Sequence, residues 1–458
     1  MKPILTALLF ATAAPLSAQS LPASGQVAAL RDAALTDDLA WNITEGLTTE
    51  VGQRLAGTAA EARARDWSVA RLRALGFANV RVETFPMAVW SREIGSDRAM
   101  VTAPFPQHLA VAALGNSAST PRQGVEGEVV GFNSVEALEA APDSAVRGKI
   151  VFVSHAMSRT MDGSSYGAFG RARREGPSIA SRKGALAIVI RSIGTDYHRN
   201  PHTGVQTFAP GVTPIPAGAL SLPDAEQLQR ILARRQPVRL RLTLISSVTQ
   251  GQSGNVIAEV PGRDRSAAPV LVACHLDSWD IGTGAIDDAA GCGIVAAAAK
   301  RIMDAGRPLR AIRIVWFGAE EVGLFGGIDY RTRHGKEPHH AIAESDFGAG
   351  RVWKVDSRLG DARKAEALAL QAALAPLGIV PGALDEASGS DISVLLADGL
   401  PGVTLNQDGT IYFDLHHTPD DTLDKVDRGE LRQNVAAWTA MLGVLAGPIE
   451  PAPKRTRR

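Results

Sequence analysis

The stretch HLDSWDIGTGAIDDAAG, residues 275–291, places one histidine and four aspartates directly after an apolar run. Glycines and alanines separate many of the charged residues. A surface turn explains polar and flexible residues at the end of a strand. A metal site explains them as well, because carboxylates packed this densely repel one another unless cations neutralise them. The surrounding segments distinguish between these two interpretations.

Two apolar patterns alternate on either side of this stretch. Continuous apolar runs typical of buried strands occur at residues 255–262, 268–278, 309–321 and 400–407. Helical apolar spacing occurs between them, at residues 291–306 and 361–378. Strands that alternate with helices predict an α/β fold with a largely parallel central sheet. In such sheets the functional groups gather at the carboxyl ends of the strands.

The chain before residue 250 has a different pattern. Apolar periodicity predicts a helix over residues 66–77 and a strand over residues 80–90. From about residue 106, short strands follow one another between glycine-rich and polar turns. Residues 160–218 are rich in glycine, serine, arginine and proline, so we expect mainly loops there, with a small helix that leads into a strand over residues 178–190.

The whole-chain composition is that of an ordinary globular protein. The chain has 458 residues, no formal net charge and an apolar fraction of 45%. This length predicts two domains or one large elaborated domain. The neutral charge gives no indication that nucleic acid or an anionic membrane is a partner.

Residues 1–18 have the pattern of a secretory signal peptide. A lysine precedes an apolar stretch at residues 4–14, and small residues follow up to Ala18. This stretch is too short for a lasting membrane span, and a retained anchor is the alternative. We therefore expect a secreted or periplasmic protein without a stable membrane span. The basic, proline-rich tail at residues 448–458 is predicted to be disordered.

The chain has two cysteines, Cys274 and Cys292. Export permits a disulfide, but a single pair is no disulfide framework of the kind that small secreted domains use. We interpret both cysteines as small buried residues, with a bridge between them as the alternative.

Histidines and carboxylates follow several of the strand-like runs. Singly, each has an ordinary explanation, such as a turn or a helix N-cap. Together they predict one site, because the ends of neighbouring strands meet at one edge of a sheet. Residues 409–415 are also interpreted as a strand-like run here. The residues concerned are His275, Asp277, Asp287, Asp288, Glu320, Glu321, Asp346, His416 and His417.

The types of side chain select the metal. Histidine with carboxylates and no thiolate suits zinc better than Mg²⁺ or Ca²⁺. The supply of carboxylates exceeds what one zinc ion needs. Two ions about 3.5–4 Å apart, bridged by one carboxylate, fit this inventory.

The chain resembles the di-zinc exopeptidases of peptidase family M28. Residues 275–291 look most like the carboxypeptidase Q (plasma glutamate carboxypeptidase) branch of that family. The resemblance rests on four motifs in the family's order, HLDS…DDAAG, WFGAEEVGLFG, ESDFG and HHTPDDT.

This resemblance implies an architecture. It covers the start at residues 52–77 and the catalytic half, and implies a three-layer α/β/α domain with a mixed, largely parallel sheet. That domain would consist of residues 19–109 and 248–447. Residues 110–247 resemble an inserted, β-rich domain of the protease-associated type.

The resemblance also implies two Zn²⁺ ions and their ligands. Asp287 would bridge the ions, His275 and Asp346 would bind one, and Glu321 and His417 would bind the other. The spacing from His417 to the aspartate and threonine at 421–422 matches the family, so His416 is the less favoured ligand.

The remaining residues of the motifs receive supporting roles. Glu320 would be the general base, and Asp277 would orient the imidazole of His275. Tyr412 would donate a hydrogen bond to the oxyanion, with simple packing as its alternative role. Asp391 matches a wall of the family's pocket. Asp280, next to Trp279, marks the branch but receives no chemical role.

The substrate class stays open at this point. A small peptide is the expected substrate, and the resemblance suggests a homodimer. Aminopeptidase, carboxypeptidase and dipeptidase activities all fit, as does hydrolysis of N-acyl amino acids. A free substrate carboxylate would need an arginine or a helix N-terminus near the site. The arginine-rich segment at residues 171–182 is a candidate if the inserted domain folds over the cleft.

Two other uses of the fold are alternatives. A glutaminyl-cyclase-like use with one zinc ion is less consistent, because every di-zinc position is filled. A catalytically inactive binding or transport module is the non-enzymatic alternative. The presence of Glu320 and of all five ligands favours an enzyme.

Overall fold

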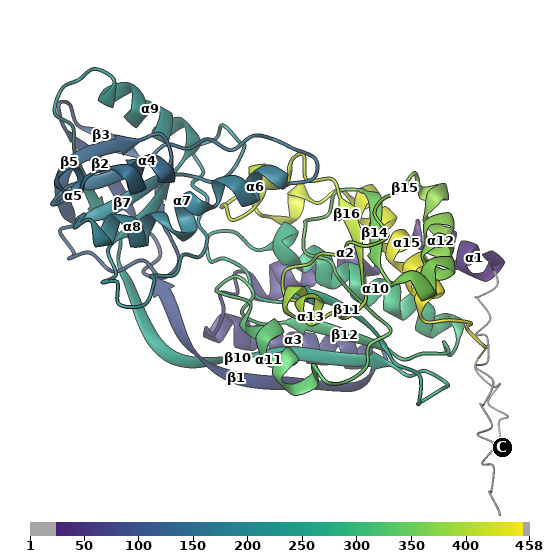
Figure 1. The fold of residues 1–458 in the computed structure, drawn as a ribbon. Coiled ribbons are helices and arrows are strands. Elements are labelled where there is room, and N and C mark those ends of the chain that lie inside the picture. Colours follow the sequence, from purple (N-terminus) through teal and green to yellow (C-terminus); the bar gives the residue numbers. More distant parts are fainter. Residues whose placement is uncertain (1–23, 452–458) are drawn as a thin grey trace, which may run out of the picture.

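The computed structural model describes residues 24–451 (Figure 1). The predicted signal peptide lies outside these residues, as does most of the predicted tail. Among residues 24–451, no helix has both the length and the apolar character needed to cross a membrane.

The C-terminal half is organised around a sheet of eight strands, which we call the first sheet. Its inner strands pair in parallel and its outer pairs are mainly antiparallel, so the predicted mixed, largely parallel sheet is confirmed. In order across the sheet, the strands are β1 (Ala78–Arg92), β10 (Ser246–Val260), β12 (Ile312–Phe317), β11 (Val270–His275), β13 (Ala341–Glu344), β16 (Gly402–Gln407), β14 (Val352–Arg358) and β15 (Val380–Pro381).

Helices cover both faces of the first sheet. The central strands β11 and β12 are almost entirely buried, as expected for parallel strands sandwiched between two helical layers. One layer contains α1 (Ser24–Ala34), α2 (Leu39–Gly46), α3 (Ala59–Ala74), α10 (Ala290–Ala305), α12 (Lys364–Leu374) and α15 (Arg428–Leu445). The other contains α11 (Phe325–His334) and α13 (Ser393–Ala397). The three-layer architecture is therefore confirmed.

A second sheet of eight strands is formed by residues 98–243, which we call the second-sheet region. Its strands, in order, are β3 (Gln107–Leu109), β2 (Arg98–Ala103), β9 (Arg239–Thr243), β5 (Val125–Phe132), β6 (Ile150–Val153), β7 (Ala187–Arg191), β8 (Ala217–Leu220) and β4 (Val111–Ala113). The helices around it include α4 (Val135–Ala140), α5 (Asp143–Val146) and α9 (Leu222–Leu232). The exact domain boundaries stay predictions.

One local expectation was wrong, and another held in part. The small helix leading into a strand is confirmed as α8 (Gly176–Arg182) and β7, and residues 192–216 are mainly loops, as expected. The segment before α8 instead forms two short helices, α6 (Ser164–Phe169) and α7 (Arg171–Arg174), which its composition does not predict. Residues 409–415 are not a strand, because α14 (Tyr412–Leu415) lies there. Tyr412 and Phe413 are both buried, and adjacent residues of a strand would point to opposite faces.

A long two-stranded ribbon connects the two sheets (Figure 1). Strands β1 and β10 pair antiparallel from Ala78↔Glu259 to Arg92↔Ser246. At the far end of this ribbon, β2 and β9 continue into the second sheet. Helix α6 reaches from the second-sheet region towards the C-terminal part of the chain, drawn in yellow.

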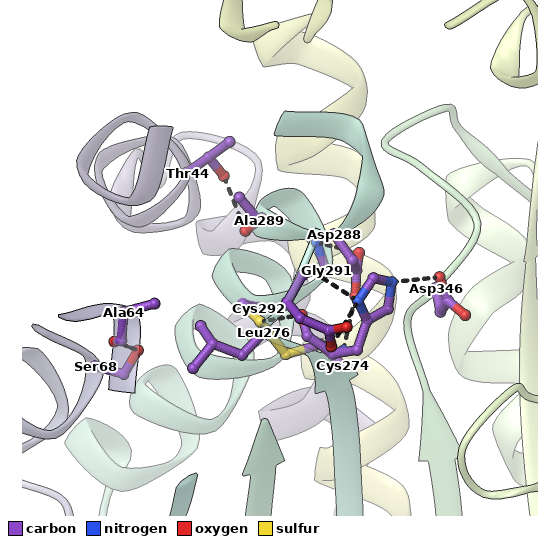
Figure 2. The surroundings of a disulfide bond; sticks show 12 residues. Thr44, Ala64, Ser68, Cys274, Leu276, Asp288, Ala289, Gly291, Cys292 and Asp346 are labelled. Carbon is purple, nitrogen blue, oxygen red and sulfur yellow. Dashed lines mark hydrogen bonds and ion pairs between the residues drawn. A yellow bond between two sulfur atoms is a disulfide. The ribbon is translucent and has the colours of Figure 1, made fainter. Parts of the chain in front are cut away.

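Cys274 and Cys292 form a disulfide between the end of β11 and the first turn of α10 (Figure 2). Both residues are buried, as expected, but they are bonded rather than free. The parallel strand and the helix that follows it pack directly together, which brings the two side chains into contact. The favoured interpretation of two unbridged cysteines is therefore corrected.

Candidate metal centre

The predicted side chains converge at the carboxyl ends of β11, β12 and β13. His275 ends β11, Glu320 and Glu321 follow β12, and Asp346 follows β13. His417 reaches the same place from the turn after α14, with a positive φ of 61°. These loops bring together side chains from four separate segments.

Asp287 lies at the centre of this cluster, with one oxygen towards each histidine. Its Oδ1 is 2.9 Å from His275 Nε2, and its Oδ2 is 3.3 Å from His417 Nε2. His275 Nε2 is also 3.2 Å from Asp346 Oδ1. His417 Nε2 is 2.9 Å from Glu321 Oε2. The carboxylate of Asp287 therefore connects two groups of potential ligands.

His416 lies against His417, with their rings stacked at 3.4 Å between centroids. Its Nε2 is 3.6 Å from Asp287 Oδ2, slightly farther than that of His417. Burial and the neighbouring His417 lower the pKa of His416 well below its usual value, so its ring stays neutral. Both histidines are close enough to the cluster to be considered as ligands.

The donor set fits divalent cations. Potential ligand atoms within 4.8 Å of one another form overlapping groups that contain all five predicted ligands, together with Asp288 and His416. Asp287 Oδ2 and Glu321 Oε1 are buried and accept no hydrogen bond from the described residues. A buried carboxylate oxygen without a donor is costly, and a cation satisfies it.

The electrostatics of the cluster reflect its crowding. Burial, together with the nearby carboxylate of Asp287, raises the pKa of Glu321 well above its usual value. Burial opposes the charged form of His275, but Asp346 and Asp287 outweigh it and raise the pKa of His275. Burial also disfavours the charged form of Asp287, but a hydrogen bond from His275 lowers its pKa well below the usual value. The carboxyl groups thus compete for negative charge at close range, and a bound cation would favour the charged form of each.

Glu320 has a different environment from the ligands. It belongs to none of the potential ligand groups found among the described residues. It lines a cavity of about 370 Å³, together with Asp287, Glu321 and Tyr412. Burial, followed by the charge of Asp346, raises the pKa of Glu320 well above its usual value. Glu320 thus faces open space beside the cluster.

Asp277 supports the cluster differently from what the sequence predicts. Its carboxylate accepts hydrogen bonds from the backbone N–H groups of Glu320 and Glu321, at 3.0 and 3.3 Å. The backbone carbonyl of Asp277 accepts the hydrogen bond from His275 Nδ1, at 3.0 Å, whereas its carboxylate is 3.8 Å away. The side chain thus fixes the Glu320–Glu321 turn and the main chain orients His275.

Tyr412 lines the cavity from α14. Burial, followed by the charge of Asp287, raises the pKa of Tyr412 well above its usual value, so its hydroxyl stays protonated. No hydrogen bond of this hydroxyl to another described residue is found. The hydroxyl is thus available as a donor.

Two other predicted residues have structural contacts. Asp391 is fully buried, accepts a hydrogen bond from Gly327 N at 2.8 Å and does not line the cavity. Asp280 pairs with Arg92, with Oδ2 2.9 Å from Nε. The indole of Trp279 packs 5.7 Å from the ring of His417, measured between centroids.

Arg54 is a supporting residue to which the sequence gave no role. It is fully buried and donates hydrogen bonds to the carbonyls of Leu276, Thr283 and Gly284. These carbonyls belong to the loop between His275 and Asp287. Its segment, GQRLAG, is part of the family resemblance, which was the available signal.

The second-sheet region contributes further residues that sequence reasoning missed. Thr203 N donates to the carbonyl of His417 at 3.0 Å, and His417 Nδ1 donates back to the carbonyl of Thr203 at 3.3 Å. His202 Nδ1 donates to the carbonyl of His416 at 2.8 Å, and its Nε2 is 2.7 Å from Asp196 Oδ1. No local pattern marks these residues.

Residues 255–442 match the sequence profile of peptidase family M28. Carboxypeptidase Q from Bos taurus is 32% identical over 413 residues, covering 89% of this chain and 85% of the relative. The chain belongs to peptidase family M28.

The solved M28 structures agree with this assignment. The peptidase M28 precursor from Shewanella amazonensis SB2B has 42% identity and a TM-score of 0.90, covering 94% of this chain and 99% of that one. A zinc aminopeptidase from Bacillus subtilis shares the fold, with 21% identity, a TM-score of 0.64 and coverage of 88% and 94%. As an M28 protein similar to carboxypeptidase Q, the chain is a metallo-exopeptidase.

Proposed function

We propose that this protein is a di-zinc exopeptidase that hydrolyses dipeptides or short peptides, with Glu320 as its general base. The observation that carries the proposal is the position of Asp287, whose two oxygens face His275 and His417 separately. One ion would be held by His275, Asp346 and Asp287. The other would be held by Glu321, His417 and Asp287.

Each part of the site has one task in this mechanism. Bound zinc ions supply positive charge that acidifies water and polarises the peptide carbonyl. Glu320 takes a proton from the attacking water and passes it to the nitrogen of the leaving amine. Asp277 keeps Glu320 in place by holding its backbone N–H. Tyr412 donates its hydroxyl hydrogen to the oxygen that becomes negative during attack.

The family resemblance also suggests the domain organisation, the location and the oligomeric state of the protein. Residues 19–109 and 248–447 would form the catalytic domain, and residues 110–247 a protease-associated-type domain. The protein would be secreted or periplasmic after removal of residues 1–18, and would act as a homodimer. The disulfide between Cys274 and Cys292 supports an oxidising location.

Substitution of the base tests this mechanism. We expect Glu320→Gln to retain two zinc ions per chain and to lower kcat by about 10²–10⁴-fold, because proton transfer alone is impaired. Metal content is measured by elemental analysis, and kcat with a dipeptide. Glu45→Gln, at an exposed position of α2, is the matched control and should keep full activity.

Two results would contradict the proposal. Wild-type turnover in Glu320→Gln would exclude Glu320 as the base. A metal content well below one ion per chain in active wild-type protein would exclude the di-zinc site. Chelation should abolish activity, and added zinc should restore it.

A further inference from the structure

Arg54 lies against the loop that joins His275 to Asp287, two of the predicted metal ligands. It belongs to the segment between α2 and α3, and its side chain is fully buried. All three nitrogens of its guanidinium donate hydrogen bonds to backbone carbonyls near the two ends of this loop, those of Leu276, Thr283 and Gly284. One planar side chain thus connects the two ends of the loop that separates the ligands.

The main chain of Arg54 holds the same loop at a further point. Its N–H donates to Ser278 Oγ at 3.2 Å, and Ser278 N donates to the carbonyl of Arg54 at 3.3 Å. The guanidinium also fits closely, since a Cβ added at Gly284 would lie 2.8 Å from Nη1. Because so many hydrogen bonds join them, Arg54 and the loop keep one arrangement relative to each other.

The positive charge of Arg54 has no close carboxylate partner. Among the described residues, no carboxylate oxygen lies within 4.0 Å of its guanidinium. Burial lowers the pKa of Arg54, and the charges of four carboxylates oppose this shift, those of Asp421, Asp277, Asp288 and Asp287. Asp287 would be bound to the metal ions. The other three belong to neither proposed ligand set, and we call them the supporting carboxylates.

Each supporting carboxylate accepts a hydrogen bond from the backbone N–H of a predicted ligand or of the residue before one. For Asp277, Asp288 and Asp421, the donors are Glu321, His275 and Ile286, at 3.3, 3.2 and 2.6 Å. These carboxylates hold ligands in place without binding an ion. Negative charges gathered in a buried site repel one another unless a cation offsets them. Arg54 is a buried cation whose charge acts on all three.

We propose that Arg54 is a positioning residue of the metal centre, which fixes His275 and Asp287 relative to each other and offsets the charge of the supporting carboxylates. This inference rests on the proposed di-zinc function and extends it to a residue that does not line the cavity. Because Asp287 would bridge the two ions, a displaced loop should weaken the binding of both. Lysine would keep the charge but lacks the planar fork of donors that reaches three carbonyls.

The test measures zinc binding to the intact protein after its metal has been removed. We expect Arg54→Met to lower the affinity for both ions by about 100-fold, and Arg54→Lys by about 10-fold, as for other groups that orient metal ligands. Titration calorimetry in the presence of a competing chelator measures the affinity and the number of ions bound. The partial recovery by lysine separates the contribution of charge from that of the hydrogen bonds.

Cobalt gives a second readout, which a purely structural role of Arg54 would leave unchanged. The visible absorption of Co²⁺ bound in place of zinc depends on the geometry of its ligands. At saturating Co²⁺, we expect the absorption bands of both Arg54 variants to differ from those of wild type in position and intensity. Identical spectra in all three proteins would overturn the inference.

Two arginines provide matched controls. Arg31, on α1, is also buried and donates to a backbone carbonyl, that of Ala373, at 2.9 Å. Arg31→Met should lower thermal stability and leave zinc affinity and the cobalt spectrum unchanged. Arg63→Met, at an exposed position of α3, should change none of the three. An equal loss of zinc affinity in Arg31→Met would assign the effect to general destabilisation and overturn the inference.

The remaining outcomes separate this inference from the proposed function. Wild-type zinc affinity in both Arg54 variants would overturn the role of Arg54, even where thermal stability falls. Loss of one ion alone would overturn its effect on the bridge. If Arg54→Met does not fold, Arg54→Lys decides the test, because it keeps the buried charge. Wild-type protein that binds fewer than two zinc ions would contradict the proposed function instead.

Discussion

Asp287 and Asp288 are neighbours in the sequence but face different partners. Asp287 faces two imidazoles, whereas Asp288 accepts hydrogen bonds from the backbone N–H groups of His275 and Gly291, at 3.2 and 3.0 Å. Burial raises the pKa of Asp288 well above its usual value, in contrast to the lowered pKa of Asp287. Asp287 is thus placed to contact metal ions, whereas Asp288 connects the end of β11 to the start of α10.

At the residue scale, Tyr412→Phe tests the oxyanion donor. We expect kcat to fall by about 10²–10³-fold, the effect of removing one such donor, with zinc content unchanged. Thermal stability should change little, because the hydroxyl bonds to no other described residue. An unchanged kcat would assign Tyr412 to packing alone. Tyr197→Phe, at an exposed position, is the control.

At this scale, sequence reasoning identified side chains that the fold brings together. The five predicted ligands and Glu320 all lie around one cavity or cluster. It could not assign a role to Arg54, whose partners are backbone carbonyls that any sequence provides. It also placed the wrong part of Asp277 against His275, because spacing does not distinguish a carbonyl from a carboxylate.

At the scale of elements, the His416–His417 turn is supported from outside its own half of the chain. His202 and Thr203 bond to its backbone, and Asp196 holds His202. This support fixes the positive φ of His417, a conformation that costs a residue with a side chain about 1–3 kcal/mol.

Removal of this support should therefore weaken zinc binding. We expect His202→Ala to lower zinc affinity by about 10–100-fold, the usual effect of losing a group that orients a ligand. Affinity is measured by competition with a chromogenic chelator, and the unfolding curve of the metal-free protein monitors the fold. His108→Ala, at an exposed position, should leave affinity unchanged. Wild-type zinc affinity in His202→Ala would show that the His416–His417 turn keeps its conformation without this support.

The disulfide is a second feature at this scale, because it connects β11 to α10 across the loop that carries Asp287. Its sequence separation is 18 residues. For a loop of this size, we expect a double variant, Cys274→Ala with Cys292→Ala, to lose about 3 kcal/mol in the free energy of unfolding. Denaturant unfolding measures this loss. An unchanged midpoint would mean that packing alone holds strand and helix together.

Element types were predictable wherever the apolar pattern was long. The strands β11 and β12 and the helices α10 and α12 match their predicted segments. The short helices α6, α7 and α14 were not predictable, because so few residues carry too weak a periodicity and packing decides their conformation.

At the scale of the whole molecule, Arg92 joins the two sheets at the end of the ribbon. It donates to Asp280 from the first-sheet half, to Asp97 and to Thr203 Oγ1 of the second-sheet region. Trp279, adjacent to Asp280, packs against Trp90 of β1 at 6.4 Å between centroids. Trp279 and Asp280, to which the sequence assigns no chemical role, thus form a structural junction between the two sheets.

Breaking this junction should affect stability and activity together. We expect Arg92→Met to lower the free energy of unfolding by about 3–5 kcal/mol, since Asp280 and Asp97 lose their partner. It should also lower kcat/KM, because Thr203 supports His417. Calorimetry and dipeptide kinetics check these outcomes. Arg98→Met, at an exposed position of β2, is the control. A variant that lost stability but kept full kcat/KM would separate the junction from the site.

The approach of the second-sheet region to the candidate metal centre could not be predicted. Arg173 and His417 are 244 residues apart, and their contact depends on how two separately patterned halves pack. The sequence offered the arginine-rich segment 171–182 as a candidate, but not which arginine reaches the cavity.

The ribbon of β1 and β10 also constrains the order in which the chain can fold. β1 is synthesised long before its partner β10, so their pairing has to wait until the residues between them are synthesised. Once that region folds, β2 pairs with β9 and brings the adjacent ends of β1 and β10 together. Most of the loop-closure entropy for pairing β1 with β10 is then already lost. We therefore expect folding of the second-sheet region to favour the pairing of β1 with β10.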